Sequence, residues 1–200
     1  MVTSRPDVFI HETADVSDGA AIGPHTRVWH QAQIMDGARI GSHCNLGKGV
    51  FVASGVTIGN NVKIQNYVSL YNGVTIEDDV LLGPHMTFTN DLYPRAFVDD
   101  YTVYETLVKR GASVGANATI VCGVTLDEYC IVAAGAVIVA NVPAYTLVTG
   151  NPGRVMGYVC KCGKRLDVPK TAKQHGAPAP VQCHACGKSY EFQPGLIPML

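Results

Sequence analysis

The sequence predicts an all-β protein in which a prism of stacked β-coils is followed by a small cysteine-rich tail. Three observations predict it: a six-residue repeat that runs from Ile10 to Leu82, a break in that repeat after Phe88, and a pair of cysteine motifs near the C-terminus. Together they indicate one long repetitive domain that carries a loop and ends in a short appendage.

The repeat places an aliphatic anchor at every sixth position of the first part of the chain. The anchors are Ile10, Val16, Ile22, Val28, Ile34, Ile40, Leu46, Val52, Ile58, Ile64, Leu70, Ile76 and Leu82. Four residues after each anchor stands a smaller or slimmer residue, from Ala14 to Met86. A period of six fits neither a helix nor an alternating strand, and it is typical of a solenoid.

Three hexads make one triangular coil, so every third anchor belongs to the same column along the prism axis. One such column is Ile10, Val28, Leu46, Ile64 and Leu82. Stacking buries each anchor between its neighbours above and below, and burial contributes about 25 cal/mol per Å² of apolar surface. A column of this kind can hold the prism together without helices.

The third residue after an anchor is the expected turn between two faces. In many hexads it is a type that tolerates a positive φ: Gly19, Gly37, Gly49, Gly55, Asn61, Gly73 and Asp79. In the column of corners after the first face this position carries Thr13, Gln31, Gly49, Tyr67 and His85, and all of these except Gly49 depart from those types. Tyr67 and His85 are therefore candidates for a site; the alternative is that histidine itself tolerates positive φ and that tyrosine caps a coil edge.

The period breaks after Phe88. Residues 89–107 carry no hexad pattern, and the step from Phe88 to the next anchor, Val108, is not a multiple of six. We therefore expect an extruded loop over 89–107, and loops of this length without internal structure are usually functional. The repeat resumes with Val108, Val114, Ile120, Leu126, Val132 and Ile138.

Two cysteine motifs define the tail. Cys183-x-x-Cys186-Gly has the regular spacing of a zinc knuckle, and Cys160-x-Cys162-Gly is one residue shorter. They predict a structural zinc ion held by four cysteines, which leaves no open position for catalysis. His184 could replace a ligand, but its place inside the knuckle argues against that role.

Composition bounds the class of protein and its parts. A change of composition near Gly157 predicts a prism domain, 1–157, and a zinc-ribbon-like tail, 158–200. A net charge of −1 gives no electrostatic case for nucleic acid or a membrane surface. The N-terminus lacks a charged segment followed by an apolar one, so we expect a cytoplasmic protein. The remaining cysteines fall inside the repeat, as small buried residues of a reducing compartment.

Several stretches resemble one family of enzymes. The hexad prism is similar to the left-handed parallel β-helix of the hexapeptide-repeat acyltransferases, and the left hand is implied by that resemblance alone. Over about residues 8–157, four stretches look like sugar-nucleotide 3-N-acetyltransferases: RVWHQAQIMDGARIGSHCNLG, KIQNYVSLYNGVTIEDDVLLGPHMTFTNDLYPRA, LVKRGASVGANATIVCGV and VTGNPGR. The motif FTN is far more discriminating than the hexads.

The resemblance implies an acetyl-CoA-dependent N-acetyltransferase that acts on the 3-amino group of a nucleotide-linked sugar for surface-polysaccharide biosynthesis. The nearest branch acts on UDP-2-acetamido-3-amino-2,3-dideoxyglucuronate, and the alternative branch acts on dTDP-3-amino-3,6-dideoxyhexoses. The family forms trimers whose active sites lie between adjacent prisms, which implies a homotrimer here.

The resemblance also implies catalytic roles. Asn90 of FTN would hold the 3-amino group, and His85, with Asp91 as its helper, would accept the proton of that group, since an imidazole changes charge near neutral pH. The glucuronate branch usually carries a small residue in place of His85 and a non-acidic residue in place of Asp91. These two residues therefore draw the chain toward the dTDP-linked branch.

Two further sets of residues are candidates for binding. Those expected to line the nucleotide-sugar site are Asn66, Tyr67, Tyr71, Trp29 and Arg95, each of which could alone be a packed or solvated residue. The expected contacts to the phosphates of coenzyme A are Lys109, Arg110 and Arg154, for which the alternative is ordinary surface charge.

Two other classes of protein remain open. The same fold is used by γ-type carbonic anhydrases, whose histidines bind a catalytic metal between subunits, so His25, His30 and His43 are of interest. His25 and His30 are expected on different faces, however, and the FTN loop and the GNPGR segment have no place in that interpretation. The other class is a non-enzymatic scaffold, which failure to bind acetyl-CoA would favour.

Overall fold

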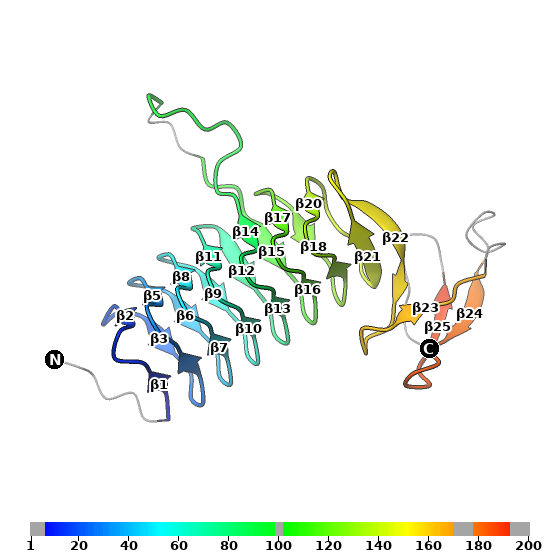
Figure 1. The fold of residues 1–200 in the computed structure, drawn as a ribbon, viewed down its shortest axis with the longest axis horizontal. Helices are drawn as coiled ribbons and strands as arrows, with labels where there is room; N and C mark the ends of the chain where they lie inside the picture. Colours follow the sequence, from blue (N-terminus) through cyan, green and yellow to red (C-terminus); the bar gives the residue numbers. More distant parts are fainter. Residues whose placement is uncertain (1–6, 99–101, 170–177, 193–200) are drawn as a thin grey trace.

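The computed structural model describes residues 7–98, 102–169 and 178–192. Short strands stack into a long prism, a loop projects from the middle of that prism, and a small tail lies at its C-terminal end (Figure 1). These described residues contain no helix, and so none that is long and apolar enough to cross a membrane. The predicted all-β architecture is confirmed, and it is consistent with the left-handed β-helix that the resemblance implies.

Three parallel sheets form the faces of the prism. The first sheet contains β1 (Phe9–Ile10), β4 (Arg27–Val28), β7 (Asn45–Leu46), β10 (Lys63–Ile64), β13 (Leu81–Leu82), β16 (Ser113–Val114) and β19 (Ile131–Val132). The second contains β2 (Asp15–Val16), β5 (Gln33–Ile34), β8 (Phe51–Val52), β11 (Ser69–Leu70), β14 (Thr87–Phe88), β17 (Thr119–Ile120) and β20 (Val137–Ile138). The third contains β3 (Ala21–Ile22), β6 (Arg39–Ile40), β9 (Thr57–Ile58), β12 (Val74–Ile76), β15 (Thr106–Val108) and β18 (Thr125–Leu126).

The strand register confirms the predicted columns of anchors. In the first sheet Ile10 pairs with Val28, and the column continues coil by coil through Leu82 to Val132. Anchors from Val28 onward are almost fully buried, whereas Ile10 and the other anchors of the first coil are only partly buried. The first coil has no coil beneath it, so its anchors lose half of their stacking partners.

The corners adopt the predicted backbone conformation with one exception. Gly37, Asn61 and Asp79 have positive φ, but Gly19 does not, and that expectation was wrong. Tyr67 and His85 also have positive φ, of 59° and 57°. The corner geometry is thus imposed by the coil, and residues that fit it less easily than glycine are held there by the stacked strands on either side.

The loop is two residues shorter than expected. Thr106 and Leu107 already belong to β15, so the excursion covers 89–105, of which 99–101 lie outside the described residues. Both ends of the loop are tied to the next coil: the Cys122 N–H donates to Thr89 Oγ1 (3.0 Å) and the Gly123 N–H donates to Thr106 Oγ1 (3.1 Å). These two bonds fix where the loop leaves and rejoins the prism.

The tail grows out of the first sheet. That sheet continues through β21 (Thr146–Thr149), β22 (Arg154–Val159) and β23 (Arg165–Leu166), and the last two strands join by antiparallel pairing. A separate hairpin pairs β24 (Ala179–Gln182) with β25 (Ser189–Phe192). The predicted division at 157/158 falls inside β22 and stays a prediction, because one continuous strand crosses it.

Candidate active site

Tyr67 and His85 form a stack of rings at the first corner, which joins the first sheet to the second. Their ring centroids lie 5.2 Å apart, and the planes make an angle of 23°. A Cβ on Gly49, one coil below, would lie 2.6 Å from Cδ1 of Tyr67, so glycine leaves the space that this ring occupies. Lys48 Nζ lies 5.9 Å from the Tyr67 centroid, within cation–π range.

A hollow of about 300 Å³ lies beside this stack, and the structure places two predicted substrate residues in it. Trp29 forms part of the wall and donates from Nε1 to Asn45 Oδ1 (2.8 Å). Asn66 accepts from the Lys48 N–H through Oδ1 (3.0 Å), so it already fastens one coil to the next. The hollow therefore has an aromatic wall, an amide and the Lys48 ammonium close together, which suits a polar ligand with a flat ring.

The other predicted site residues lie at the second corner, where the chain leaves the second sheet. Asp91 Oδ1 accepts from the Tyr93 N–H (2.8 Å), which starts the loop with a local turn. The described residues include no hydrogen-bond partner for the Asn90 side chain, although it is half-buried. Tyr71, one coil below, packs its ring with its centroid 6.0 Å from that of Phe51, and the exposed Arg95 donates to the adjacent Pro94 carbonyl.

The predicted catalytic residues are thus divided between two corners of one coil. His85 precedes β14, while Asn90 and Asp91 follow it, and within the described part of the chain no hydrogen bond joins His85 to either of them. A strand separates the two corners, so one copy of the chain does not bring the imidazole and the amide together.

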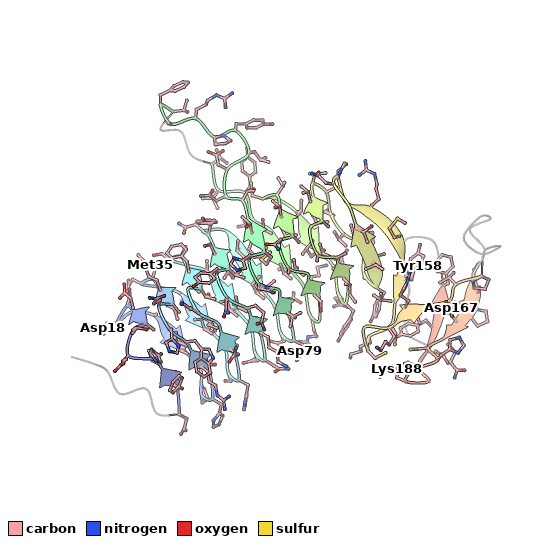
Figure 2. All side chains as sticks on the ribbon, viewed as in Figure 1. Asp18, Met35, Asp79, Tyr158, Asp167 and Lys188 are labelled. Atoms are coloured by element: carbon pink, nitrogen blue, oxygen red, sulfur yellow. The ribbon has the colours of Figure 1, made fainter. Side chains whose placement is uncertain are left out.

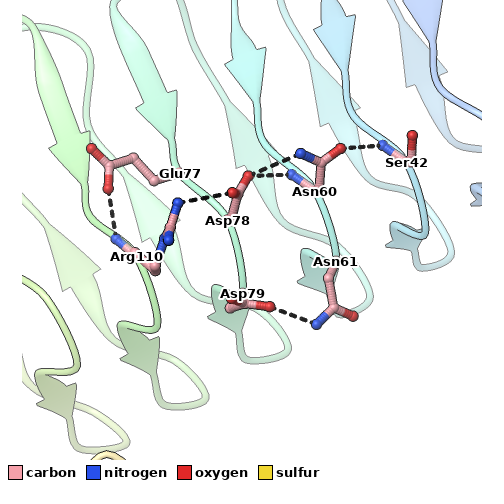
Figure 3. Close-up of polar contacts among 7 residues, drawn as sticks. All are labelled: Ser42, Asn60, Asn61, Glu77, Asp78, Asp79 and Arg110. Carbon is pink, nitrogen blue, oxygen red and sulfur yellow. Dashed lines mark hydrogen bonds and ion pairs between the residues drawn. The ribbon is translucent and has the colours of Figure 1, made fainter.

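The third corner, which joins the third sheet to the first, carries polar ladders (Figure 3). Asp78 Oδ1 accepts from the Asn60 N–H (2.7 Å), and its Oδ2 pairs with Arg110 (3.1 Å). On the neighbouring position Asn61 donates to Asp79 Oδ1 (2.7 Å). The side chains in these ladders are one another's hydrogen-bond and ion-pair partners, and we call this third corner the closed side of the prism.

The predicted coenzyme A contacts do not form one cluster. Arg110 is engaged by Asp78, and Lys109 Nζ lies 2.7 Å from Asp127 Oδ1. Arg154 lies elsewhere, beside β20 at a small hollow of about 70 Å³, and donates to the Gly153 carbonyl (3.0 Å). Their proposed role stays a prediction, and two of the three cations already have carboxylate partners.

The cysteines fall into two groups. Cys44, Cys122 and Cys130 are buried in the prism, and burial raises the pKa of Cys130 to about 12. The four tail cysteines bring their sulfurs within 4.8 Å of one another: Cys160, Cys162, Cys183 and Cys186. His184 stays outside this group, with its imidazole exposed and 3.5 Å from Asp167 Oδ2.

The histidines do not assemble a three-imidazole site. The rings of His25 and His43 lie tilted to each other at the third corner, with centroids 4.8 Å apart, while His30 stacks on His11 at the first corner, with centroids 3.5 Å apart. Among the described residues, the four tail cysteines are the one group of three or more histidine, cysteine, aspartate or glutamate side chains that could hold a metal ion. Within one copy of the chain, the three histidines of interest are thus divided between two corners.

Sequence reasoning missed three residues that shape this region. Gly49 was assigned only a turn, but it also makes room for the Tyr67 ring. Thr89 and Thr106 were placed inside the loop without a role, yet their hydroxyls anchor it to the prism. No spacing in the sequence marks this role: the threonines lie 33 and 17 residues before the amides that they bind, and only the register of the following coil reveals these contacts.

Comparison with known proteins agrees with the fold. Residues 55–87 match the bacterial transferase hexapeptide model (six repeats), and residues 110–140 match the hexapeptide repeat of succinyl-transferase. The chain is similar to AntD, an N-acyltransferase from Bacillus cereus, with 15% identity, coverage of 78% of this chain and 83% of that one, and a TM-score of 0.51. It is also similar to a maltose O-acetyltransferase from Clostridium difficile, with 21% identity, coverage of 58% and 67%, and a TM-score of 0.54.

One relative is similar in sequence. It is the dTDP-3-amino-3,6-dideoxy-α-D-galactopyranose 3-N-acetyltransferase of Aneurinibacillus thermoaerophilus, which is 41% identical over 95 residues, or 48% of this chain. The match spans 45% of that relative, so it covers less than half of the relative's length. The chain thus matches hexapeptide-repeat models over two stretches and is similar, over about half its length, to a sugar-nucleotide 3-N-acetyltransferase.

Proposed function

We propose that the chain is an acetyl-CoA-dependent N-acetyltransferase that acts on the 3-amino group of a nucleotide-linked sugar. The observation that carries this proposal is the 41% identity over 95 residues to a 3-N-acetyltransferase. The geometry supports it with a hollow walled by Trp29 and Asn66, a stack of Tyr67 and His85, and the Asn90 side chain, which has no hydrogen-bond partner among the described residues.

The first acceptor to consider is a dTDP-3-amino-3,6-dideoxyhexose. The relative in sequence acts on such a sugar, and a similar fold holds dTDP and coenzyme A in AntD. A UDP-linked 3-amino-glucuronate, UDP-2-acetamido-3-amino-2,3-dideoxyglucuronate, is the second acceptor, because the FTN segment also resembles the enzymes of that branch.

In this mechanism the amine attacks the thioester carbonyl directly. The side-chain oxygen of Asn90 accepts a hydrogen bond from the 3-amino group, and this bond orients the lone pair of the amine nitrogen toward the carbonyl carbon. The C–N bond forms first, and backbone amides stabilise the oxyanion that develops. His85 takes one N–H proton and passes it to the thiolate that departs as the C–S bond breaks. Asp91 stays an accessory to this step, because its carboxylate already accepts from Tyr93.

This mechanism calls for more than one copy of the chain. His85 and Asn90 lie at successive corners of one coil and do not meet within it. Packing of prisms side by side would set the first corner of one copy against the loop of the next. A homotrimer, as the family resemblance implies, would then hold three equivalent sites between its copies.

The test is an acetylation assay that follows thiol release from acetyl-CoA with both acceptors side by side. Turnover of the dTDP-linked sugar alone would support the first choice, and turnover of the UDP-linked sugar alone would support the second. Acetyl-CoA that neither binds in calorimetry nor turns over with either acceptor would overturn the proposal and favour a scaffold. Subunit count by light scattering tests the trimer separately.

A further inference from the structure

The four tail cysteines converge from two separate turns. Cys160 and Cys162 lie between β22 and β23, and Cys183 and Cys186 lie between β24 and β25. The Sγ atoms of Cys160 and Cys186 are 3.4 Å apart, and those of Cys162 and Cys183 are 3.6 Å apart. Four thiolates around zinc, with Zn–S bonds of about 2.3 Å, place their sulfurs about 3.8 Å from one another. The cluster therefore has the size of a tetrahedral ligand set.

The two turns close in the same way despite their different spacing. In the first, the Gly163 N–H donates to the Cys160 carbonyl (2.8 Å), and the Cys160 N–H donates to the Lys164 carbonyl (2.7 Å). In the second, the Gly187 N–H donates to the Cys183 carbonyl (2.8 Å), and the Cys183 N–H donates to the Lys188 carbonyl (2.9 Å).

Gly163 and Gly187 both have positive φ, of 84° and 74°. Each turn thus carries glycine where the chain reverses direction. The shorter motif keeps both closing hydrogen bonds although it has one residue fewer. Two turns with the same closing bonds, facing each other, form the paired knuckles of a closed metal site.

The neighbouring groups complete a second layer around one ligand. The Tyr190 hydroxyl lies 3.0 Å from Cys160 Sγ and accepts from the Lys161 N–H (2.9 Å). Tyr190 is fully buried and packs edge-on against Tyr145 of the last coil, with centroids 5.8 Å apart. The ligand set is therefore connected to the end of the prism through one hydroxyl and two rings.

Hydrophobic packing alone gives this tail little stability. Its buried cluster contains Tyr145, Cys160, Leu166, Val168, Val181, Cys183, Tyr190 and Phe192. Two of these residues are the cysteines themselves, and Tyr145 comes from the chain just before the tail. The predicted tail, 158–200, is close to the size of about 40 residues below which a unit usually needs metals, disulfides or a partner to fold.

We propose that Cys160, Cys162, Cys183 and Cys186 bind one zinc ion as a closed tetrathiolate, and that this ion clamps the β24–β25 hairpin to the C-terminal end of the prism. Four thiolates leave no position open for water, so the ion is structural. The alternative, two disulfides, would join the sulfurs in pairs but would give no reason for all four to meet within 4.8 Å.

The clamp also builds one wall of a hollow of about 370 Å³. The knuckle residues 160–163 form that wall, and Asp79, Ser113 and Tyr129 of the prism lie across from it. Lys161 Nζ lies 4.8 Å from the Tyr129 ring centroid and bridges the two sides. Loss of the metal should therefore open this hollow as well as release the hairpin.

The first experiment measures metal and thiols in the full chain, purified without added metal. We expect about one zinc per chain by elemental analysis, and much less than a tenth of that in Cys162→Ser and Cys186→Ser, which change the two exposed ligands. Cys44→Ala is the matched control and should keep its zinc, since alanine occupies the same hexad position at Ala32 and Ala38.

Three results would overturn the assignment. Iron in place of zinc, with the visible absorption of an iron tetrathiolate, would replace the metal. Absence of metal together with disulfides in the denatured, unreduced chain would replace the site by two covalent bonds. Unchanged zinc content in both serine variants would place the metal elsewhere.

The second experiment tests the clamp, by hydrogen exchange before and after removal of zinc with a chelator. We expect amides of β24 and β25 to exchange at least tenfold faster without zinc, while those of β7 and β10 in the prism stay unchanged. Equal exchange of the hairpin in both states would overturn the clamping role. Neither experiment uses turnover, so its outcome is independent of acetyl transfer.

Discussion

The first and third corners of the prism occupy equivalent positions in the hexad repeat, yet they carry different chemistry. At the third corner Asn60, Asp78 and Arg110 use one another's hydrogen-bonding groups (Figure 3). At the first corner one such rung joins the Lys48 N–H to Asn66, but Tyr67 and His85 meet through their rings. At the second corner, where the loop leaves the prism, Asn90 has no partner in the described chain. The all-atom view in Figure 2 places Asp79, a member of the closed side, on the opposite edge of the prism from the loop.

This difference separates polar groups that bond one another from polar groups that stay available to a ligand on the same scaffold. Polar groups that satisfy one another stabilise the stack, and they have little left to offer a ligand. Polar groups that the fold holds in place but leaves unsatisfied gain their partners only when something binds. We therefore expect substitutions of His85 and Asn90 to reduce turnover, and substitutions in the ladders of the closed side to reduce stability.

The largest expected effect follows Asn90→Ala. Loss of the group that positions the amine should lower kcat/KM about hundredfold, or about 2.7 kcal/mol, with little change in melting temperature. The measurement is steady-state kinetics with each acceptor, beside thermal unfolding. Asn61→Gly, an asparagine of the closed ladder, is the matched control and should keep full turnover. Full turnover in Asn90→Ala would remove this residue from the mechanism.

The second effect concerns the imidazole at the first corner. His85→Asn keeps a side chain that tolerates the φ of 57° but cannot accept the amine's proton. We expect kcat/KM to fall about tenfold near neutral pH, and its decline on the acid side to follow the substrate amine alone. The pH dependence of kcat/KM is the readout. A profile identical to that of the unchanged chain would mean that the amine arrives neutral and needs no base.

The sequence predicted the prism better than the site because the two depend on different kinds of information. Anchors such as Leu46 and Ile64 repeat in one dimension, and a period of six determines their partners without knowledge of distant contacts. Gly49 could be assigned as a turn in the same way. Its second role, making space for Tyr67, depends on a side chain in the next coil, which the period does not specify.

Pairing of charges was the least predictable feature. The family resemblance implied that Lys109 and Arg110 contact phosphates, which stays a prediction; in the structure the two side chains lie against Asp127 and Asp78. The loop was predicted to end two residues too late for a similar reason: Thr106 belongs to β15 because it pairs with the neighbouring strand, and hydropathy does not show that pairing. The four tail cysteines, by contrast, were predicted from their spacing to act together, and the structure brings their sulfurs within 4.8 Å of one another.

The third prediction concerns the closed side. Asp78→Ala removes the acceptor of the Asn60 N–H and the partner of Arg110 together. We expect the free energy of unfolding to fall by about 1–2 kcal/mol, because a hydrogen bond and a partly exposed ion pair are lost. Kinetic constants of the folded protein should stay the same. A large loss of turnover at unchanged stability would show that the third corner also belongs to a site.

The smallest effect is expected at Lys109, where structure and resemblance assign different roles. Its hydrogen bond to Asp127 raises the pKa of Lys109, so the pair contributes its stability at neutral pH and loses it only above the ordinary lysine range. Because both side chains are about one-third exposed, Lys109→Met should cost about 0.5 kcal/mol or less in chemical unfolding.

The KM for acetyl-CoA decides between the two roles of Lys109. A KM unchanged within twofold would show that the lysine serves only its ion pair, as the contact with Asp127 indicates. A rise of about tenfold or more, with stability intact, would mean that the ammonium leaves Asp127 for a phosphate when the cofactor binds. In that case the closed side would open on binding, and the contrast between the two corners would hold only for the free protein.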